Sequence, residues 1–322
     1  IDLISVNDEM ISEFKHKGYL EPLEKNVMTE EVRDSFPQKY LESICEENGH
    51  IYSVPFQMDI MMFWVNQELL KQAGLDEIKN TGDFDILQKS LKNPDQYAYG
   101  DAWENTHVYN SLSQFVNFWG GDYFDWTDPK TKDAARYMKS MLDEKNTSPA
   151  QFVDQYEQME EKFIRGKYGC VFMYTSALGT FLDADVYGKN KIHMAPLPVL
   201  HKKKATNIAT WQYVLNNASE NKDAAVRFLQ YAAGYEGSTE YAKIMKSYPA
   251  RVDVIENEDI DLEGIDMIRK YLREYTLNAR PLCENSMGAV SDMGKLFQGY
   301  VLGQCEEDSF FEQAQNCINT YY

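Results

Sequence analysis

Residues 49–66 read Gly-His-Ile-Tyr-Ser-Val-Pro-Phe-Gln-Met-Asp-Ile-Met-Met-Phe-Trp-Val-Asn, and this stretch decides the fold. It predicts a short strand, a crossing bent by a proline, and a second, apolar strand that ends at Asn66. Asn66 is a good helix cap, so a helix is expected over residues 67–73, with Gly74 ending it. Asp59 places a carboxylate where the first strand passes into the second. In a chain with two lobes, a ligand would be held at such a crossing.

The composition is that of a globular chain. It has 322 residues, 43% hydrophobic and 26% charged, and this length is sufficient for two domains with separate cores. The formal net charge of −19 argues against nucleic acid and anionic membrane surfaces as partners, because phosphate contacts need clustered Lys and Arg. The basic run Lys202–Lys204 is interpreted as a solvated loop. No apolar run reaches the roughly 18 residues of a membrane-spanning helix.

The cysteines and histidines predict neither a metal site nor a cofactor. Five cysteines occur, none of them in a Cys-x-x-Cys pair, and an odd number argues against a disulfide framework. Cys170 lies in an apolar strand and is interpreted as a core residue. The five histidines show no spacing typical of metal ligands.

Strand and helix signals alternate along the rest of the chain. Residues 1–6 alternate apolar and polar side chains as a strand does, and a helix is expected from Asn7 to Lys17. Asp128-Pro129 combines a cap residue with a proline suited to the first helical turn. The other expected elements are a helix over 151–165, a helix that begins at Ser176, a strand over 205–215, a helix capped by Ser219 whose apolar face is Ala224, Ala225, Phe228, Leu229 and Ala232, and helices at about 287–302 and 308–321 with Gly303 between them.

Several short motifs occur in an order that is typical of one family. They are Trp64-Val65-Asn66-Gln67, Gln72-Ala73-Gly74-Leu75, Trp119-Gly120-Gly121, Gly166-Lys167, Ser219-Glu220-Asn221-Lys222 and Pro249-Ala250-Arg251. Together they resemble motifs of the family 1 extracellular solute-binding proteins of ABC transporters, the sugar-binding group that includes maltose-binding protein. Each motif alone is weak, whereas their shared order and spacing cover nearly the whole chain.

The resemblance implies an α/β fold of the two-lobe, periplasmic-binding-protein-like type (type II) with discontinuous domains. Lobe 1 would hold residues 1–59 and 209–280, and lobe 2 residues 60–208 and 281–322. The crossing segments would lie near Asp59, Trp211 and Arg280. The family's opening β-α-β unit has no counterpart before Ile1, so the resemblance also implies that this chain lacks the N-terminal segment of the family.

The function implied by the resemblance is that of the substrate-binding component of an ABC importer. A sugar or oligosaccharide would be bound between the lobes, which close by a hinge, and delivered to the permease subunits in the membrane. The protein would be an extracellular monomer, either anchored to the membrane as a lipoprotein in a Gram-positive bacterium or periplasmic. It would need no cofactor, would bind no nucleic acid and would not be an enzyme.

Candidate site residues can be selected by what a sugar requires, namely carboxylates or amides for its hydroxyls and aromatic faces for its C–H groups. Asp8 and Asp59 align with ligand carboxylates of the family, although Asp8 could equally be a first-turn acid of its helix. Trp211 lies on a crossing strand and could instead be a core residue. The remaining candidates are Tyr174, Ser176, Trp103, Trp119 and Asn285.

Two alternatives stay open. The first is a binding protein for a non-sugar solute such as a polyamine, a metal or an anion, since an acidic cleft suits a cation. The second is a carbohydrate-active enzyme, because Asp122 and Asp125 could act as an acid and base pair. The chain contains no nucleophile elbow, no P-loop and no dinucleotide-binding glycine motif, and the two aspartates more simply belong to a turn.

Overall fold

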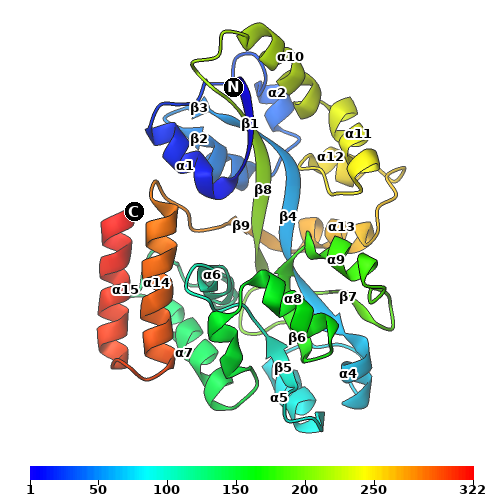
Figure 1. Ribbon diagram of the computed structural model, residues 1–322, viewed down its shortest axis with the longest axis vertical. Coiled ribbons are helices and arrows are strands. Elements are labelled where there is room, and N and C mark those ends of the chain that lie inside the picture. Colours follow the sequence, from blue (N-terminus) through cyan, green and yellow to red (C-terminus); the bar gives the residue numbers. More distant parts are fainter. The chain divides into compact units, whose positions relative to one another are not determined.

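The computed structural model describes residues 1–322, which form two compact units (Figure 1). Unit 1 comprises residues 1–60 and 208–286, and unit 2 comprises residues 61–207 and 287–322. The chain therefore passes between the units three times, after residues 60, 207 and 286. The strands β4 (Ser53–Asn66) and β8 (Ala205–Leu215) carry the first two passages without a break.

Unit 1 is built around β8, which pairs antiparallel with β1 on one side and with β4 on the other, and β9 also pairs with β8. β2 and β3 form a separate antiparallel pair. The other elements of this unit are β1 (Leu3–Asn7), α1 (Asp8–His16), α2 (Glu30–Arg33), α3 (Gln38–Tyr40), a π-helical turn (Leu41–Cys45), β2 (Glu46–Glu47), β3 (His50–Ile51), α10 (Lys222–Ala233), α11 (Tyr235–Met245), α12 (Val252–Ile255), α13 (Ile265–Glu274) and β9 (Thr276–Ala279).

In unit 2 the second half of β4 pairs antiparallel with β6 and β7, and β5 pairs parallel with β6. Its core is rich in aromatic contacts, such as Phe172 with Phe63 and Phe115. The elements are α4 (Gln67–Gln72), α5 (Thr81–Ser90), β5 (Tyr97–Gly100), α6 (Val108–Trp119), α7 (Pro129–Asp143), a 3-10 turn (Pro149–Val153), α8 (Tyr156–Ile164), β6 (Tyr168–Tyr174), α9 (Ala177–Asp183), β7 (Ile192–Ala195), α14 (Ser286–Val301) and α15 (Glu307–Tyr321).

Several expected elements are confirmed. The strand over 205–215 and the helices after Asn7 and Ser176 are present. Asp128 caps α7 by accepting a hydrogen bond from the Lys130 amide. α14 and α15 run side by side (Figure 1), with the rings of Tyr300 and Phe310 stacked at 4.5 Å. No helix of the structure combines the length and the hydropathy that a bilayer crossing requires.

The stretch that decides the fold forms two strands, as predicted, but the division between β3 (His50–Ile51) and β4 falls before Pro55 and Asp59 instead of at them. β4 runs unbroken over Ser53–Asn66, with Pro55 inside it. Its register against β8 shifts between Pro55 and Gln57, so the predicted bend is a bulge. At the bulge, Phe56 and Gln57 both contact Tyr241. The rings of Phe56 and Tyr241 lie 5.5 Å apart, and the Tyr241 hydroxyl donates a hydrogen bond of 2.8 Å to Gln57.

The helix predicted over residues 151–165 is wrong in its extent. The segment divides into the 3-10 turn Pro149–Val153 and the helix α8. Gln155 forms a capping box with Gln158, which begins a new helix, and Asp154 has extended backbone at the end of the preceding turn. The apolar spacing across the segment did not reveal this interruption.

Two predictions for the helix after Ser219 are also wrong. The cap residue of α10 is Asn221, two positions later than predicted, although the Ser219 Oγ accepts from the Asn221 amide at 3.0 Å and its hydroxyl donates to Asp2 at 2.5 Å. Phe228 was expected on a buried face but is 44% exposed. Its ring lies 5.3 Å from that of Tyr213, and both line an open, largely apolar cavity of about 260 Å³.

The cap predicted at Asn66 is present and gives a first test of the fold. Its Oδ1 accepts hydrogen bonds from the amides of Glu68 at 3.1 Å and Leu69 at 3.3 Å. Asn66→Ala should lower the free energy of unfolding by about 1 kcal/mol, measured by urea denaturation, because both amides lose their acceptor. Asn66→Asp keeps an acceptor and should be nearly neutral. Equal losses in the two variants would contradict the capping role.

Candidate functional site

Three predicted site residues of unit 1 lie at one end of its sheet. Trp211 on β8 is paired with Asn7 of β1 and with Gln57 of β4. Asp8 directly follows Asn7, and Asp59 lies two residues beyond Gln57 on the same strand. Paired residues of neighbouring strands lie about 5 Å apart, so the register brings these positions together.

Trp211 stands out because it is a large aromatic side chain that the sheet leaves open. It is 42% exposed, whereas its strand neighbours Thr210 and Gln212 are buried and bond to Tyr40. The other reading of Trp211, a core residue, therefore does not fit. Asp59 is 8% exposed on the neighbouring strand. An open indole beside a carboxylate provides both the apolar face and the hydrogen-bond acceptor that a sugar needs.

Asp8 is held by a cation that the sequence did not reveal as part of the site. Arg280 donates to both Asp8 oxygens and, at 2.8 Å, to Glu9. The Tyr40 hydroxyl also bonds to Asp8. Burial raises the pKa of Asp8, and the Arg280 guanidinium acts in the opposite direction. Asp8 thus belongs to a buried ion-pair network, in which Arg280 and Tyr40 already hold its oxygens.

Neither Arg280 nor Tyr40 was a predicted site residue. Arg280 was expected only near a crossing segment, and Tyr40 had no signal in the sequence. Thr210 and Gln212 donate to the Tyr40 hydroxyl at 2.7 and 3.0 Å, which links β8 to the Asp8 network. Only the tertiary structure brings these residues together, because they are far apart in the sequence.

In unit 2, Tyr174 lies where the chain enters and leaves the unit. It pairs with Met61, the first residue of this unit on β4. Its hydroxyl donates to Asn110 Oδ1 at 2.9 Å, and the Asn110 carbonyl accepts from Asn207, the last residue before the second passage. Ser176 precedes α9, and its side chain makes no cap hydrogen bond. Strand pairing and hydrogen bonds thus link Tyr174 to the residues at these passages, and Ser176 follows Tyr174 by two residues.

An aromatic group beside Tyr174 was missed by the sequence analysis. The half-buried Tyr156 of α8 packs edge-on against Tyr174, with ring centroids 5.9 Å apart, and against His107 at 5.3 Å. Glu104 lies 3.2 Å from His107 Nδ1 and accepts from the Thr106 amide. Tyr156 was visible in the sequence only as part of an amphipathic segment, which gives no indication of a site.

The remaining predicted residues are Trp103, Trp119 and Asn285. Trp103 is fully buried in unit 2 and donates its indole N–H to Asp101 at 2.8 Å, so it packs in the core. Trp119 ends α6 and stacks on His201 at 4.9 Å, about 13 Å along the helix from Asn110. Asn285 is exposed in the turn before the third passage. No group of three or more His, Cys, Asp or Glu residues is arranged to hold a metal ion.

Sequence comparisons relate this chain to solute-binding proteins. Residues 1–239 match the family model described as bacterial extracellular solute-binding protein. A probable amino-acid ABC transporter periplasmic-binding protein of Sinorhizobium fredii is 24% identical over 239 residues, which cover 70% of this chain and 54% of that protein. The arabinooligosaccharide-binding protein of Bacillus subtilis is 23% identical over 248 residues, which cover 72% of this chain and 56% of that protein. The chain spans about half the length of the curated relatives that it matches.

Solved structures confirm the predicted fold class. An ABC transporter solute-binding protein of Thermotoga lettingae, bound with alpha-D-tagatose, superposes with a TM-score of 0.84 at 18% identity. The match covers 99% of this chain and 84% of that chain. The fold is therefore the α/β fold of the two-lobe periplasmic solute-binding proteins, as the ordered motifs predicted.

Proposed function

Because this chain belongs to the bacterial extracellular solute-binding protein family, we propose that it is the substrate-binding component of an ABC importer and that its solute is a sugar or oligosaccharide. The observation that carries the proposal is the exposed Trp211, whose register partner Gln57 lies two residues before Asp59 on β4. Aromatic rings beside carboxylates suit the alternating apolar and hydroxyl surfaces of a sugar.

Each unit, taken by itself, offers candidate residues for the solute. Unit 1 supplies Trp211, Asp59 and the Asp8 network, and unit 2 supplies Tyr174 and Tyr156. All except Tyr156 are near the chain passages or joined by hydrogen bonds to residues that are. In this proposal the units are lobes that close on the solute by bending at the three passages, and the closed form is what the permease recognises.

The same proposal covers location and assembly. The protein acts outside the cytoplasmic membrane as a monomer, held to the surface by a lipid anchor or free in a periplasm, and it performs no catalysis. The names of the relatives support both a sugar solute, as in the arabinooligosaccharide-binding protein, and a different solute class, as in the amino-acid transporter component. A non-sugar solute such as an amino acid, a polyamine, a metal or an anion is the alternative.

A ligand screen separates these solute classes. The thermal midpoint of the 322-residue chain should rise with at least one mono- or oligosaccharide, because only a ligand that prefers the native state stabilises it. Spermidine, amino acids and ferric citrate are the comparison ligands. A rise with one of these and with no sugar would replace the sugar by that solute class, and no rise with any ligand would contradict binding by this chain.

Two substitutions then test the site with the sugar that binds. Trp211→Ala and Tyr156→Ala should each weaken the dissociation constant about tenfold in calorimetric titration, because each removes one aromatic face worth about 1.4 kcal/mol. Tyr19 is 53% exposed, and its carbonyl accepts from the amide of Asn217, six residues along the chain from Trp211, so Tyr19→Ala is the matched control and should leave affinity unchanged. Unchanged affinity in both site variants, with native thermal midpoints, would contradict the placement of the solute.

A further inference from the structure

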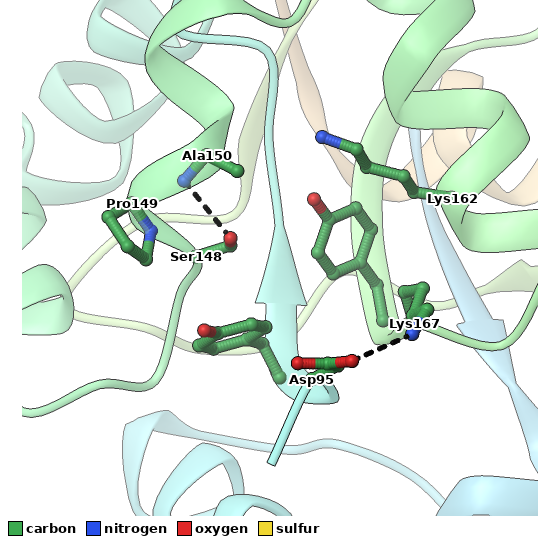
Figure 2. Close-up of a pocket in the computed structure, with 8 residues that line it drawn as sticks. Asp95, Ser148, Pro149, Ala150, Lys162 and Lys167 are labelled. Carbon is green, nitrogen blue, oxygen red and sulfur yellow. Dashed lines mark hydrogen bonds and ion pairs between the residues drawn. The ribbon is translucent and has the colours of Figure 1, made fainter. Parts of the chain in front are cut away.

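A cavity of about 310 Å³ lies in unit 2 (Figure 2), within the size range of small-ligand pockets. It is lined by Tyr168, the first residue of β6, whereas Tyr174 of the proposed solute site is the last. Six residue steps along a strand separate these two tyrosines by about 20 Å. The cavity is therefore distinct from the proposed solute site, and a ligand could occupy it whether or not the solute is a sugar.

Two tyrosines contribute to one side of the cavity. Tyr97 of β5 is paired directly with Tyr168 of β6, so the two side chains lie on the same face of the sheet. Gly100 makes room for the Tyr168 ring, because a Cβ at position 100 would lie 2.1 Å from an atom of that ring. Burial raises the pKa of Tyr168, whose hydroxyl is hydrogen-bonded to Ser148, so this hydroxyl stays protonated at neutral pH. The result is a fixed aromatic surface with hydroxyl groups.

Two lysines line the cavity as well. Figure 2 shows Lys162 reaching from one wall toward Ser148 and Ala150 on the other, with Lys167 beside Asp95. Lys162 Nζ binds the buried Asp154 at 2.5 Å, and since an ammonium has three N–H donors, this bond leaves capacity for a ligand. Lys167 Nζ lies 3.5 Å from a carboxylate oxygen of the highly exposed Asp95. An exposed ion pair of this kind contributes little to stability.

The polar groups of the lining are mostly hydrogen-bond donors. The lysines and the tyrosine hydroxyls can donate, and each lysine is paired with one aspartate, Lys162 with Asp154 and Lys167 with Asp95. Because an ammonium has three N–H donors, both lysines keep donors that a ligand can use. A carboxylate is the group that accepts from two ammonium ions, and a flat ring is the body that packs on a tyrosine face.

We propose that this cavity binds a small organic acid with a ring-shaped body. Its carboxylate lies between Lys162 and Lys167, where it displaces Asp95 from Lys167, and its ring packs on Tyr97. Ser148 and the Tyr168 hydroxyl limit the depth to which the ring enters.

The probe is 4-hydroxybenzoate, titrated into the 322-residue chain and followed by calorimetry and by backbone amide NMR shifts. We expect shifts confined to residues 95–97, 148–150 and 162–168. The neutral analogue 4-hydroxybenzamide should bind at least tenfold more weakly, and added salt should weaken the acid because the lysine contacts are screened. Inorganic phosphate, which has charge but no ring, should also bind at least tenfold more weakly.

Substitutions complete the test. Lys167→Gln should weaken the acid about fivefold, since it removes one partly exposed charge contact, and Tyr97→Ala should weaken it at least as much. Lys79 forms an exposed ion pair with Glu77 at 3.0 Å in the same unit, so Lys79→Gln is the matched control and should have no effect. Absence of binding, equal binding of acid and amide, or equal affinity in Lys167→Gln and the control would each overturn the proposal. If inorganic phosphate bound as tightly as 4-hydroxybenzoate, the proposal that the ligand has a ring would be overturned.

Discussion

Arg280→Met is expected to lower the free energy of unfolding at pH 7 by about 3–5 kcal/mol, because it leaves a buried carboxylate without its cation. Asp8 is fully buried and Arg280 is only 9% exposed, so water cannot replace the lost contacts. Glu9, which also bonds to Arg280, would add like-charge repulsion. Urea denaturation monitored by circular dichroism measures the loss, with Arg280→Lys as a variant that keeps the charge but not the two-pronged geometry.

The pH dependence of this variant has a defined sign. Burial raises the pKa of Asp8 above its ordinary value of 3.8, and the substitution removes the guanidinium that opposes this shift. The folded variant therefore binds a proton that the unfolded chain releases, so its stability rises as pH falls from the folded pKa toward 3.8. The difference in free energy of unfolding between the natural chain and Arg280→Met should therefore become smaller as pH falls through this range. The double variant Asp8→Asn/Arg280→Met should recover part of the loss at pH 7, and no recovery would contradict the ion-pair explanation.

Asp101→Ala is the second substitution with a large expected effect, a loss of about 4 kcal/mol or more in the free energy of unfolding. Asp101 is fully buried and accepts hydrogen bonds of 2.6–2.8 Å from Tyr99, Trp103, Ser111 and the Ala102 amide. Alanine would leave these four buried donors without their acceptor, at about 1–3 kcal/mol each and not additively.

The measurement is again a urea midpoint, with two comparison variants. Asp101→Asn keeps one acceptor oxygen and should lose less than alanine. Asp183 is exposed at the end of α9, and Asp183→Ala should change stability by less than about 0.5 kcal/mol. A native midpoint for Asp101→Ala would show that water satisfies the four donors. The Ser111 bond also fixes the first turn of α6, so Asp101→Ala should loosen the neighbouring contact of Asn110 with Tyr174.

Local signals predicted much of the fold correctly. Asn66 and Asp128 could be recognised as caps because capping depends on a few adjacent residues. The β4 bulge and the division of the 151–165 helix were not predictable, because strand register and a new capping box decide them. Phe228 was assigned to a buried face from helical spacing alone, which does not show whether another element covers that face.

The candidate site was less predictable than the fold. Asp59 and Trp211 lay near expected crossings, and the register of the sheet brings their strands together. Trp103 was selected as an aromatic residue, but its buried bond to Asp101 could not be seen in the sequence. Arg280 and Tyr156 were missed, because both are brought to their partners only by packing between distant segments.

The discontinuous make-up of unit 1 sets the order in which the chain can assemble. Its first strand pairs Leu3 with Leu215, so that ladder must wait for residues made far later, whereas the β4–β6 and β5–β6 ladders of unit 2 lie within residues 61–174. The loop between β1 and β8 is the longer one, so closing it costs more chain entropy before stabilising contacts can form. During synthesis from the N-terminus, the sheet of unit 2 therefore forms first. Until residues 205–215 are made, β1 and the first half of β4 lack β8 as their partner, and in this interval their edges are most open to aggregation.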